Sequence, residues 1–201
     1  MNFDFSDDQQ AIKRTAHDLL ADRLKPDTVR ELAEGERYDD AHWAEIADLG
    51  WAGIAIDEAH GGQGLGMVEL AILAEELGYT VAPVPFLSNA AGGIAIQHAG
   101  SDAQRERLLP GIASGETRAT AGLLRRNGVA ALVPDADSAA TIVLFDAEGS
   151  GGVVLEAADC DIEPLATIDQ TRRYARVTPR DGAGEPSGGQ GSKTPPKKHG
   201  S

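Results

Sequence analysis

The sequence is poor in cysteine, in aromatic residues and in positive charge. Its single cysteine, Cys160, is too few for an internal disulfide or a cysteine-based metal cluster. An aromatic fraction of 4% predicts a core built mainly from Ala, Leu, Ile and Val, which suits closely packed helices. The net charge of −14 argues against nucleic acid and anionic membranes as partners, because both bind basic surfaces.

Long hydrophobic runs are also missing from the 201 residues. No apolar segment approaches the roughly 20 residues that a membrane-spanning helix needs. Residues 1–10 are acidic and polar, unlike a signal peptide. We therefore expect a cytoplasmic protein without a membrane segment. The length allows one large hydrophobic core or two small ones.

The first 116 residues carry the apolar spacing of α-helices. Serine-led capping boxes at 6–9 (SDDQ) and 101–104 (SDAQ) predict two helix starts. Gly50 and Gly78 predict helix ends, and Pro110 is expected to close or kink the last helix. Together these signals predict an N-terminal all-α helical domain over residues 1–116, with helices near 6–23, 29–33, 40–49, 67–77, 86–99 and 101–110.

After residue 116 the hydrophobic pattern changes to short β-branched or alternating runs separated by Gly, Pro and Asp. They indicate a small antiparallel sheet or partial barrel, assigned as a second domain over residues 117–180. Residues 181–201 contain no large apolar side chain and are expected to form a disordered tail, so the predicted fold class is α+β. The predicted strands are 117–124, 129–133, 141–145, 152–155 and 173–178.

A glycine-rich loop at 61–66 (GGQGLG) permits two interpretations. It could cradle a phosphate, as such loops do in dinucleotide-binding folds. However, its glycine spacing differs from the phosphate-binding fingerprint, and residues 57–60 (DEAH) separate it from the apolar run that should lead directly into it. The sequence favours a structural turn, in which glycine lets the chain bend tightly against a neighbour.

No constellation of residues reveals a catalytic centre. His60, beside the glycine-rich loop, is a candidate general base or metal ligand, but no second histidine stands at metal-ligand spacing and a surface role is favoured. The sequence has no Gly-x-Ser-x-Gly motif of a hydrolase. Two arginine pairs, Arg125-Arg126 and Arg172-Arg173, either meet a phosphate-bearing cofactor or lie solvated on a hairpin.

A series of short motifs, each weak alone, nevertheless occurs in a characteristic order. They are 5–10 (FSDDQQ), 43–51 (WAEIADLGW), 58–66 (EAHGGQGLG), 75–78 (EELG), 82–85 (APVP), 107–116 (RLLPGIASGE) and 167–173 (TIDQTRR). In this order they resemble the acyl-CoA dehydrogenase family, flavoprotein oxidoreductases of lipid metabolism that desaturate acyl thioesters between the α and β carbons. The resemblance covers residues 2–178.

The resemblance implies a subunit of three parts: an N-terminal helical domain, a middle β domain and a C-terminal helical bundle. FAD would lie between the last two parts and a neighbouring subunit, and acyl-CoA would enter against helices of the first. The glutamate that acts as base in the family belongs to the bundle, which these 201 residues do not include. No catalytic residue is therefore assigned.

The resemblance also implies candidate binding residues. On the helical side, four positions with an apolar or small side chain are expected to line an acyl pocket: Phe86, Leu87, Ala90 and Ala91. On the β side, three positions stand where the family has a flavin-contacting segment: Leu123, Leu124 and Arg125.

Two functional hypotheses follow from the sequence. In the first, the chain is an acyl-CoA dehydrogenase subunit that works in a homo- or hetero-oligomer, where a full-length partner supplies the base and most of the FAD site. In the second, it is an interaction module or a truncated remnant with no activity alone. Retained flavin and the mass in solution would discriminate between them.

Overall fold

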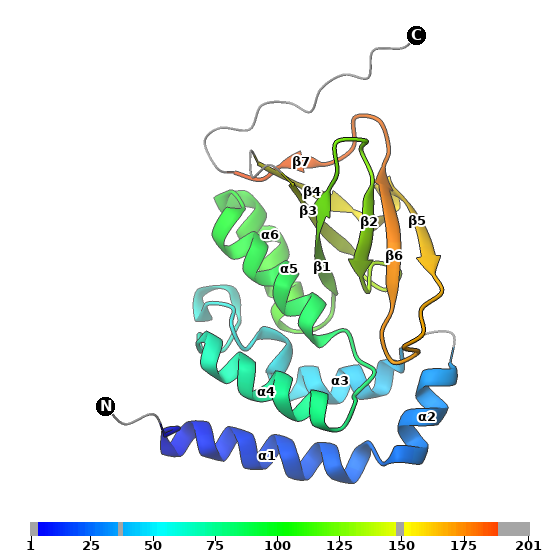
Figure 1. The fold of residues 1–201 in the computed structure, drawn as a ribbon. Helices are drawn as coiled ribbons and strands as arrows, with labels where there is room; N and C mark the ends of the chain where they lie inside the picture. The colour runs from blue at the N-terminus through cyan, green and yellow to red at the C-terminus, as the bar shows by residue number, and fades with distance from the viewer. Residues whose placement is uncertain (1–3, 36–37, 148–150, 189–201) are drawn as a thin grey trace.

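The structure, a computed structural model, describes residues 4–35, 38–147 and 151–188. A layer of helices lies below a β part, and α5 lies between the two (Figure 1). Two short 3-10 turns, η1 (Trp51–Gly53) and η2 (Glu58–His60), connect α3 to α4. The helices are α1 (Asp7–Arg23), α2 (Pro26–Glu34), α3 (Asp40–Asp48), α4 (Met67–Tyr79), α5 (Phe86–Ala99) and α6 (Asp102–Ala113).

The helix starts follow the local signals of the sequence. Both capping boxes are formed, because the hydroxyl groups of Ser6 and Ser101 accept hydrogen bonds from the backbone N–H groups of Gln9 and Gln104. Gly50 adopts the left-handed conformation after α3, with φ 75°, as predicted. Local side-chain chemistry is therefore enough to place these boundaries.

Two helices run past their predicted ends. α4 continues one residue beyond Gly78, and α6 continues through Pro110 for a further three residues. Proline removes one backbone hydrogen bond from a helix. The neighbouring Leu109 and Ile112 are both 0% exposed, so burial of this turn outweighs the local penalty.

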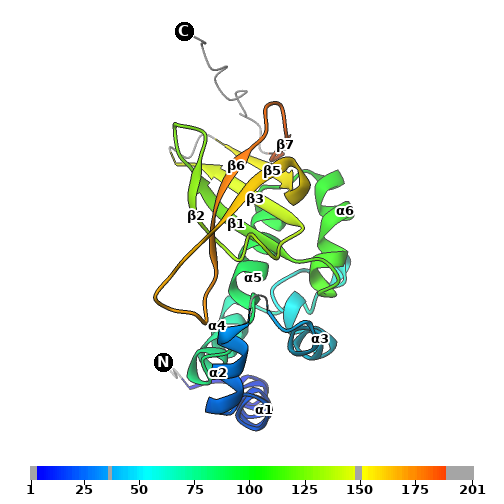
Figure 2. The same ribbon diagram turned by 90° about the vertical axis from the view of Figure 1, so that its right-hand side faces the viewer.

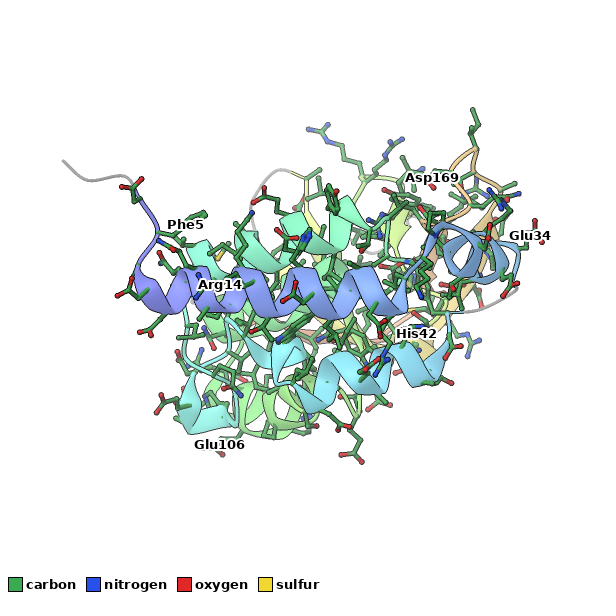
Figure 3. All side chains as sticks on the ribbon, turned by 90° about the horizontal axis from the view of Figure 1, so that it is seen from below. Phe5, Arg14, Glu34, His42, Glu106 and Asp169 are labelled. Carbon is green, nitrogen blue, oxygen red and sulfur yellow. The ribbon has the colours of Figure 1, made fainter. Side chains whose placement is uncertain are left out.

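An apolar core holds the helices together, with α1 packed across α4 and beside α3 (Figure 3). Leu20 of α1, Ile46 of α3 and Leu73 of α4 are buried in it. Trp43 lies in the same core and donates its indole N–H to the carbonyl of Gly115, 2.8 Å away. This last contact ties α3 to the segment that leads from the helices into the strands.

Two sheets form the β part (Figure 2). One has the strand order β1-β3-β4-β7 and the other has the order β2-β6-β5. An apolar core that includes Val133, Ile142, Leu144 and Val177 fills the space between them. The strands are β1 (Ala119–Leu124), β2 (Ala130–Pro134), β3 (Thr141–Asp146), β4 (Gly152–Glu156), β5 (Cys160–Leu165), β6 (Tyr174–Pro179) and β7 (Glu185–Pro186).

The predicted α+β class is confirmed, with one exception to the antiparallel pairing. β1 and β3 run parallel, whereas the other paired strands are antiparallel. The chain leaves the first sheet after β1, forms β2 in the second sheet and returns as β3 in the original direction. The change from helices to strands falls between Ala113 and Ala119, next to the expected boundary at 116, and the division into domains remains a prediction.

The sequence analysis missed β5. Its residues (CDIEPL) carry two acids and Pro164, which weaken a strand signal. The strand lies at the edge of its sheet, where proline and charged side chains are tolerated. Pairing with β6 from Cys160 to Leu165 stabilises this strand, although its local propensity is weak.

The prediction of a disordered tail over residues 181–201 is wrong for residues 181–188. Residues 181–188 lie against the protein as a strap, and β7 within it pairs with β4. The guanidinium of Arg107 on α6 donates to Glu185 at 2.9 Å, and the amide of Gln104 donates to the carbonyl of Pro186 at 3.2 Å. Backbone pairing and α6 side chains thus order a segment without large apolar residues; residues 189–201 lie outside the described part.

The strap gives a first testable prediction. Gly184 has φ +86°, and a Cβ there would overlap the side chains of Val153 and Leu155, whereas Gly182 has φ +77° and open space around it. We expect Gly182→Ala to cost about 1–2 kcal/mol from backbone strain alone. Gly184→Ala should cost about 1–3 kcal/mol more through overpacking. Urea unfolding of the two variants measures the difference; equal costs would show that the strap does not press on β4.

Candidate functional site

The four predicted acyl-facing residues divide between two faces of α5. Phe86 and Ala90, one helical turn apart, point inward and are 2% and 7% exposed. Leu87 and Ala91 point outward, and Leu87 is 56% exposed. Only the second pair can meet a ligand or partner without rearrangement of the core.

A small cavity of about 20 Å³ lies beside the first turn of α5. That is room for about one water molecule, not for an acyl chain. Arg172 borders it and donates from Nη1 to the carbonyl of Ala82 at 3.1 Å. The other lining residues are apolar and come from α4, α5 and the connector between them: Ala74, Leu77, Val84, Phe86 and Leu87.

A buried polar cluster lies next to this cavity, where the helical and β parts meet. The Tyr38 hydroxyl donates to Oδ1 of Asp135, and the Ser88 hydroxyl donates to Oδ2 of the same carboxyl, each at 2.5 Å. Tyr38 and Asp135 are 8% exposed, and Ser88 is 2% exposed. The three residues come from the α2–α3 link, from α5 and from the turn after β2.

Two arginines at the start of β6 border the polar cluster. The guanidinium of Arg173 lies 5.0 Å from the centre of the Tyr38 ring and donates to the carbonyl of Gly35. Burial raises the pKa of Asp135 overall, although the hydrogen bonds from Ser88 and Tyr38 and the positive charge of Arg172 each lower it. Burial, with the adjacent Asp135, raises the pKa of Tyr38 as well. Arg172 and Arg173 therefore donate to the protein's own carbonyls. The side chains of the other predicted pair, Arg125 and Arg126, are exposed.

The predicted flavin-contacting residues lie at the end of β1 and in the hairpin that follows, at the far end of the β part from α4 (Figure 1). Leu123 is 63% exposed. The backbone N–H of Arg125 donates to Val129, and the carbonyl of Leu124 accepts from Ala147, so these groups are used within the β part. The segment offers an apolar edge and the exposed side chain of Arg125, so these three residues do not by themselves make up a site for FAD.

The glycine-rich loop is a structural turn, as the sequence favoured. Its backbone N–H groups donate inside the protein: Gln63 to Gly53 at 3.0 Å, Gly64 to Ile56 at 2.8 Å and Leu65 to Ile54 at 3.0 Å. A Cβ at Gly62 would overlap the carbonyl of Ile56. Because the donors are already bonded, the loop cannot cradle a phosphate.

A second polar group of residues lies in a groove of about 290 Å³ between α1 and α4. Glu76 is 4% exposed and is bonded by Lys13 at 3.0 Å and by His17 at 2.9 Å. Burial alone raises the pKa of Glu76, but the hydrogen bonds from His17 and Lys13 together outweigh it and leave the pKa below its ordinary value. The charged walls of this groove do not suit an acyl chain.

Sequence reasoning missed the Tyr38–Ser88–Asp135 cluster. The three residues are separated by tens of positions and have no fixed spacing, so no motif could reveal them. The only local signal was Asp135 after Pro134, which predicts a turn. In the described part of the chain no group of three or more His, Cys, Asp or Glu side chains is placed to hold a metal. Nor is any helix there long and apolar enough to cross a membrane.

Comparison with known proteins gives consistent matches. A family model described as "Acyl-CoA dehydrogenase, N-terminal domain" matches residues 6–116. The chain is 27% identical over 175 residues to acyl-CoA dehydrogenase IpdE2 of Mycobacterium tuberculosis, a match covering 85% of this chain and 51% of that protein. The chain thus spans about half the length of the curated relatives it matches most fully.

Solved structures share the fold over nearly the whole described chain. The Tcur3481-Tcur3483 steroid ACAD G363A variant matches with a TM-score of 0.78 and 26% identity, over 89% of this chain and 56% of that one. The ChsE4-ChsE5 complex of Mycobacterium tuberculosis matches with a TM-score of 0.82 and 21% identity, over 94% and 59%. Other structures with this fold, at 17% and 20% identity, are complexes with FADH2 and with FAD.

The groove between α1 and α4 gives a second prediction. The lowered pKa of Glu76 means that its contribution to stability is present above the ordinary carboxyl value of 4.5 and is lost as pH falls through the lowered pKa. We expect Glu76→Gln to lower the free energy of unfolding at neutral pH by about 1–3 kcal/mol. The free energy of unfolding of the variant should also fall less steeply as pH drops below 4.5. Denaturant unfolding across pH measures both effects. If the free energy of unfolding of the variant falls with pH as steeply as that of the unmodified protein, the contribution assigned to Glu76 is contradicted.

Proposed function

The chain belongs to the acyl-CoA dehydrogenase family, and on this premise we propose that it is part of a subunit that takes part in α,β-desaturation of an acyl-CoA thioester. The strongest support is that the helical part and the β part occur together in one fold. That fold matches an acyl-CoA dehydrogenase of 26% identity over 89% of the chain. Family membership alone would not require the β part to be present.

The outer face of α5 is the proposed point of contact with the acyl group. Leu87 and Ala91 present an apolar, small-residue surface on this face. Acyl pockets need apolar walls with few polar groups. Because the cavity beside the first turn of α5 measures only about 20 Å³, the opposite wall of the acyl pocket is proposed to come from other polypeptide.

FAD is the cofactor of this family and is proposed to bind only in the assembled enzyme. The Leu123–Arg125 edge would then cover one side of the flavin as an apolar surface, while another subunit supplies the polar contacts. The two buried carboxyls, Glu76 and Asp135, already accept hydrogen bonds from neighbouring side chains and do not lie at the outer face of α5. Neither therefore suits the role of base. A fuller partner subunit is proposed to supply that group, and the two-subunit complex among the structural neighbours supports this arrangement.

The alternative function is a non-catalytic interaction module. The poor fit of the Leu123–Arg125 segment to FAD favours it for the chain alone. The two functions predict different behaviour of the purified material. Under the first, co-purification with a fuller subunit restores flavin and turnover; under the second, association leaves turnover unchanged.

The test is co-expression with a full-length acyl-CoA dehydrogenase subunit. We expect a complex of higher mass that carries flavin absorption. Short, long and steroid-linked acyl-CoA thioesters are added in turn, the last because one neighbour is a steroid acyl-CoA dehydrogenase. One class should bleach the flavin and reduce an electron acceptor. A colourless chain that never associates would overturn the proposal, and turnover by the chain alone would overturn the need for a partner.

A matched pair of variants tests the α5 face. Leu87→Glu places a charge on the proposed acyl wall, and Leu49→Glu places the same charge at the end of α3, where leucine is 44% exposed. We expect Leu87→Glu to lower kcat/KM of the complex by roughly tenfold or more, since a pocket contact is worth about 1–3 kcal/mol. Leu49→Glu should leave kcat/KM within about twofold, as surface changes usually do. Equal effects of the two variants would remove the acyl-binding role from α5.

A further inference from the structure

The loop between β5 and β6 brings an arginine to the first turn of α5. This loop extends from the β part towards the helices (Figure 2), and Arg172 within it donates from Nη1 to the carbonyl of Ala82 at 3.1 Å. Arg172 and Leu87 line the same cavity of about 20 Å³. Because Leu87 belongs to the α5 face that is proposed to meet the acyl group, a cation lies at the edge of that acyl wall.

The side chain of Arg172 has donors to spare. A guanidinium group carries five N–H donors. Within residues 4–35, 38–147 and 151–188, this side chain is bonded to the Ala82 carbonyl and forms no ion pair. Arg172 is half-buried, so its charge is partly removed from water. A partly buried charge is stabilised best by a charged acceptor, and a neutral carbonyl meets only part of that need.

Two carboxyl groups lie close enough to Arg172 to be influenced by its charge, but both are bonded elsewhere. The two oxygens of Asp135 each accept from a hydroxyl group. Asp169 accepts from the hydroxyl of Thr171 at 2.6 Å and from the backbone N–H of the same residue at 2.9 Å. The guanidinium of Arg172 therefore keeps donors that a ligand can use.

Other arginines of the described chain differ from Arg172 in this respect. Arg173, its neighbour, lies 3.9 Å from the carboxylate of Asp137. The sequence has 32 acidic residues against 18 Lys and Arg, so carboxylate partners are plentiful. An arginine that lacks one beside a proposed binding surface is the arrangement expected where the ligand supplies the anion. The other arginines that pair with a carboxylate include Arg105, Arg107, Arg118 and Arg176.

The rest of the cavity indicates the chemistry of that ligand. An apolar wall suits a hydrocarbon chain, and the planar guanidinium binds a carboxylate through two parallel N–H···O bonds. The phosphates of coenzyme A match the site less well, because they carry several negative charges and the cavity lining contains one cation. Apart from Arg172, the lining consists of Ala74, Leu77, Ala82, Val84, Phe86 and Leu87.

We propose that the acyl group carries a carboxylate in addition to its thioester, and that Arg172 binds this carboxylate. Arg172 is then a specificity-determining residue of the acyl site. The inference rests on the proposed function, because it takes the outer face of α5 as the acyl wall. The hydrocarbon part of the acyl group lies against Leu87, and the carboxylate lies at the edge of the wall. A neutral chain end in the same place covers the guanidinium without giving it an acceptor, which is unfavourable.

The test compares acyl thioesters that differ only in the carboxylate. The complex of this chain with a full-length acyl-CoA dehydrogenase subunit is given adipyl-CoA against hexanoyl-CoA, and sebacyl-CoA against decanoyl-CoA. We expect kcat/KM to favour the carboxylate in at least one pair by roughly 10- to 100-fold, which is the contribution of hydrogen bonds to a charged group. Calorimetric binding of the same thioesters should show the same preference without turnover. Equal or tighter binding of the neutral thioester in both pairs would overturn the inference.

Variants assign the preference to Arg172. Arg172→Met should lower kcat/KM for the carboxylate thioester by roughly 10- to 100-fold and change the value for its neutral counterpart by less than about threefold. Arg172→Lys keeps the charge and loses the paired donors, so it should retain part of the preference. Arg176→Met, an exposed arginine paired with Glu163 on the β part, is the matched control and should keep the preference unchanged. Equal losses for both thioesters in Arg172→Met and Arg172→Lys would show a purely structural role.

The remaining outcomes separate this inference from the proposed function. Turnover of neutral thioesters without a carboxylate preference contradicts the inference and leaves the proposed function standing. Turnover of neither class by a flavin-containing complex contradicts both. Hexanoyl-pantetheine, which lacks the phosphates of coenzyme A, identifies the anion. If Arg172→Met weakens binding of hexanoyl-CoA but not of hexanoyl-pantetheine, Arg172 binds a coenzyme phosphate and the assignment to an acyl carboxylate is wrong.

Discussion

The contact between α5 and β1 is the constraint on which the rest of the structure depends. Asn89, which is 0% exposed, donates to the carbonyls of Ala52 and Ile112 and accepts from the backbone N–H of Ala119. One side chain thus joins η1, the end of α6 and the start of β1. A buried amide with all three partners satisfied is stabilising, whereas loss of any one would leave a buried polar group unpaired. Gly92, one turn further on, lets the backbone of β1 approach α5, because a Cβ there would lie 2.5 Å from that of Ala119.

Two further groups of contacts between the helical and β parts lie near the two ends of α5. At its start, the Tyr38–Ser88–Asp135 cluster joins three distant segments through hydroxyl and carboxyl groups. Beyond its other end, the strap from 181 to 188 connects α6 to the edge of β4. α5 is therefore held in its first turn by Asn89 and by the polar cluster around Ser88, and near its other end by the strap-bound α6. Such a helix presents a fixed outer face, which a binding surface requires.

The roles proposed for this chain and for a partner subunit follow from the groups that this half of the family fold contains and lacks. It provides apolar surface at Leu87 on α5 and at Leu123 on β1, both more than half exposed. Its buried carboxyls are already bonded, and its glycine-rich loop has used its backbone donors. An apolar wall without a base or a phosphate cradle becomes catalytic only when a second surface closes over it.

The sequence by itself determined the features that depend on neighbouring residues. The sequence predicted the capping boxes at Ser6 and Ser101, the left-handed Gly50, strands β1 to β4 and β6, and the family order of motifs, because a few adjacent side chains decide them. Tertiary structure alone decided that α6 passes through Pro110, that β5 and β7 form, and that Phe86 and Leu87 face opposite ways. It also decided the polar cluster, whose members lie at 38, 88 and 135. A carboxyl is buried and its pKa is raised only through the segments that surround it, and those segments are distant in the chain.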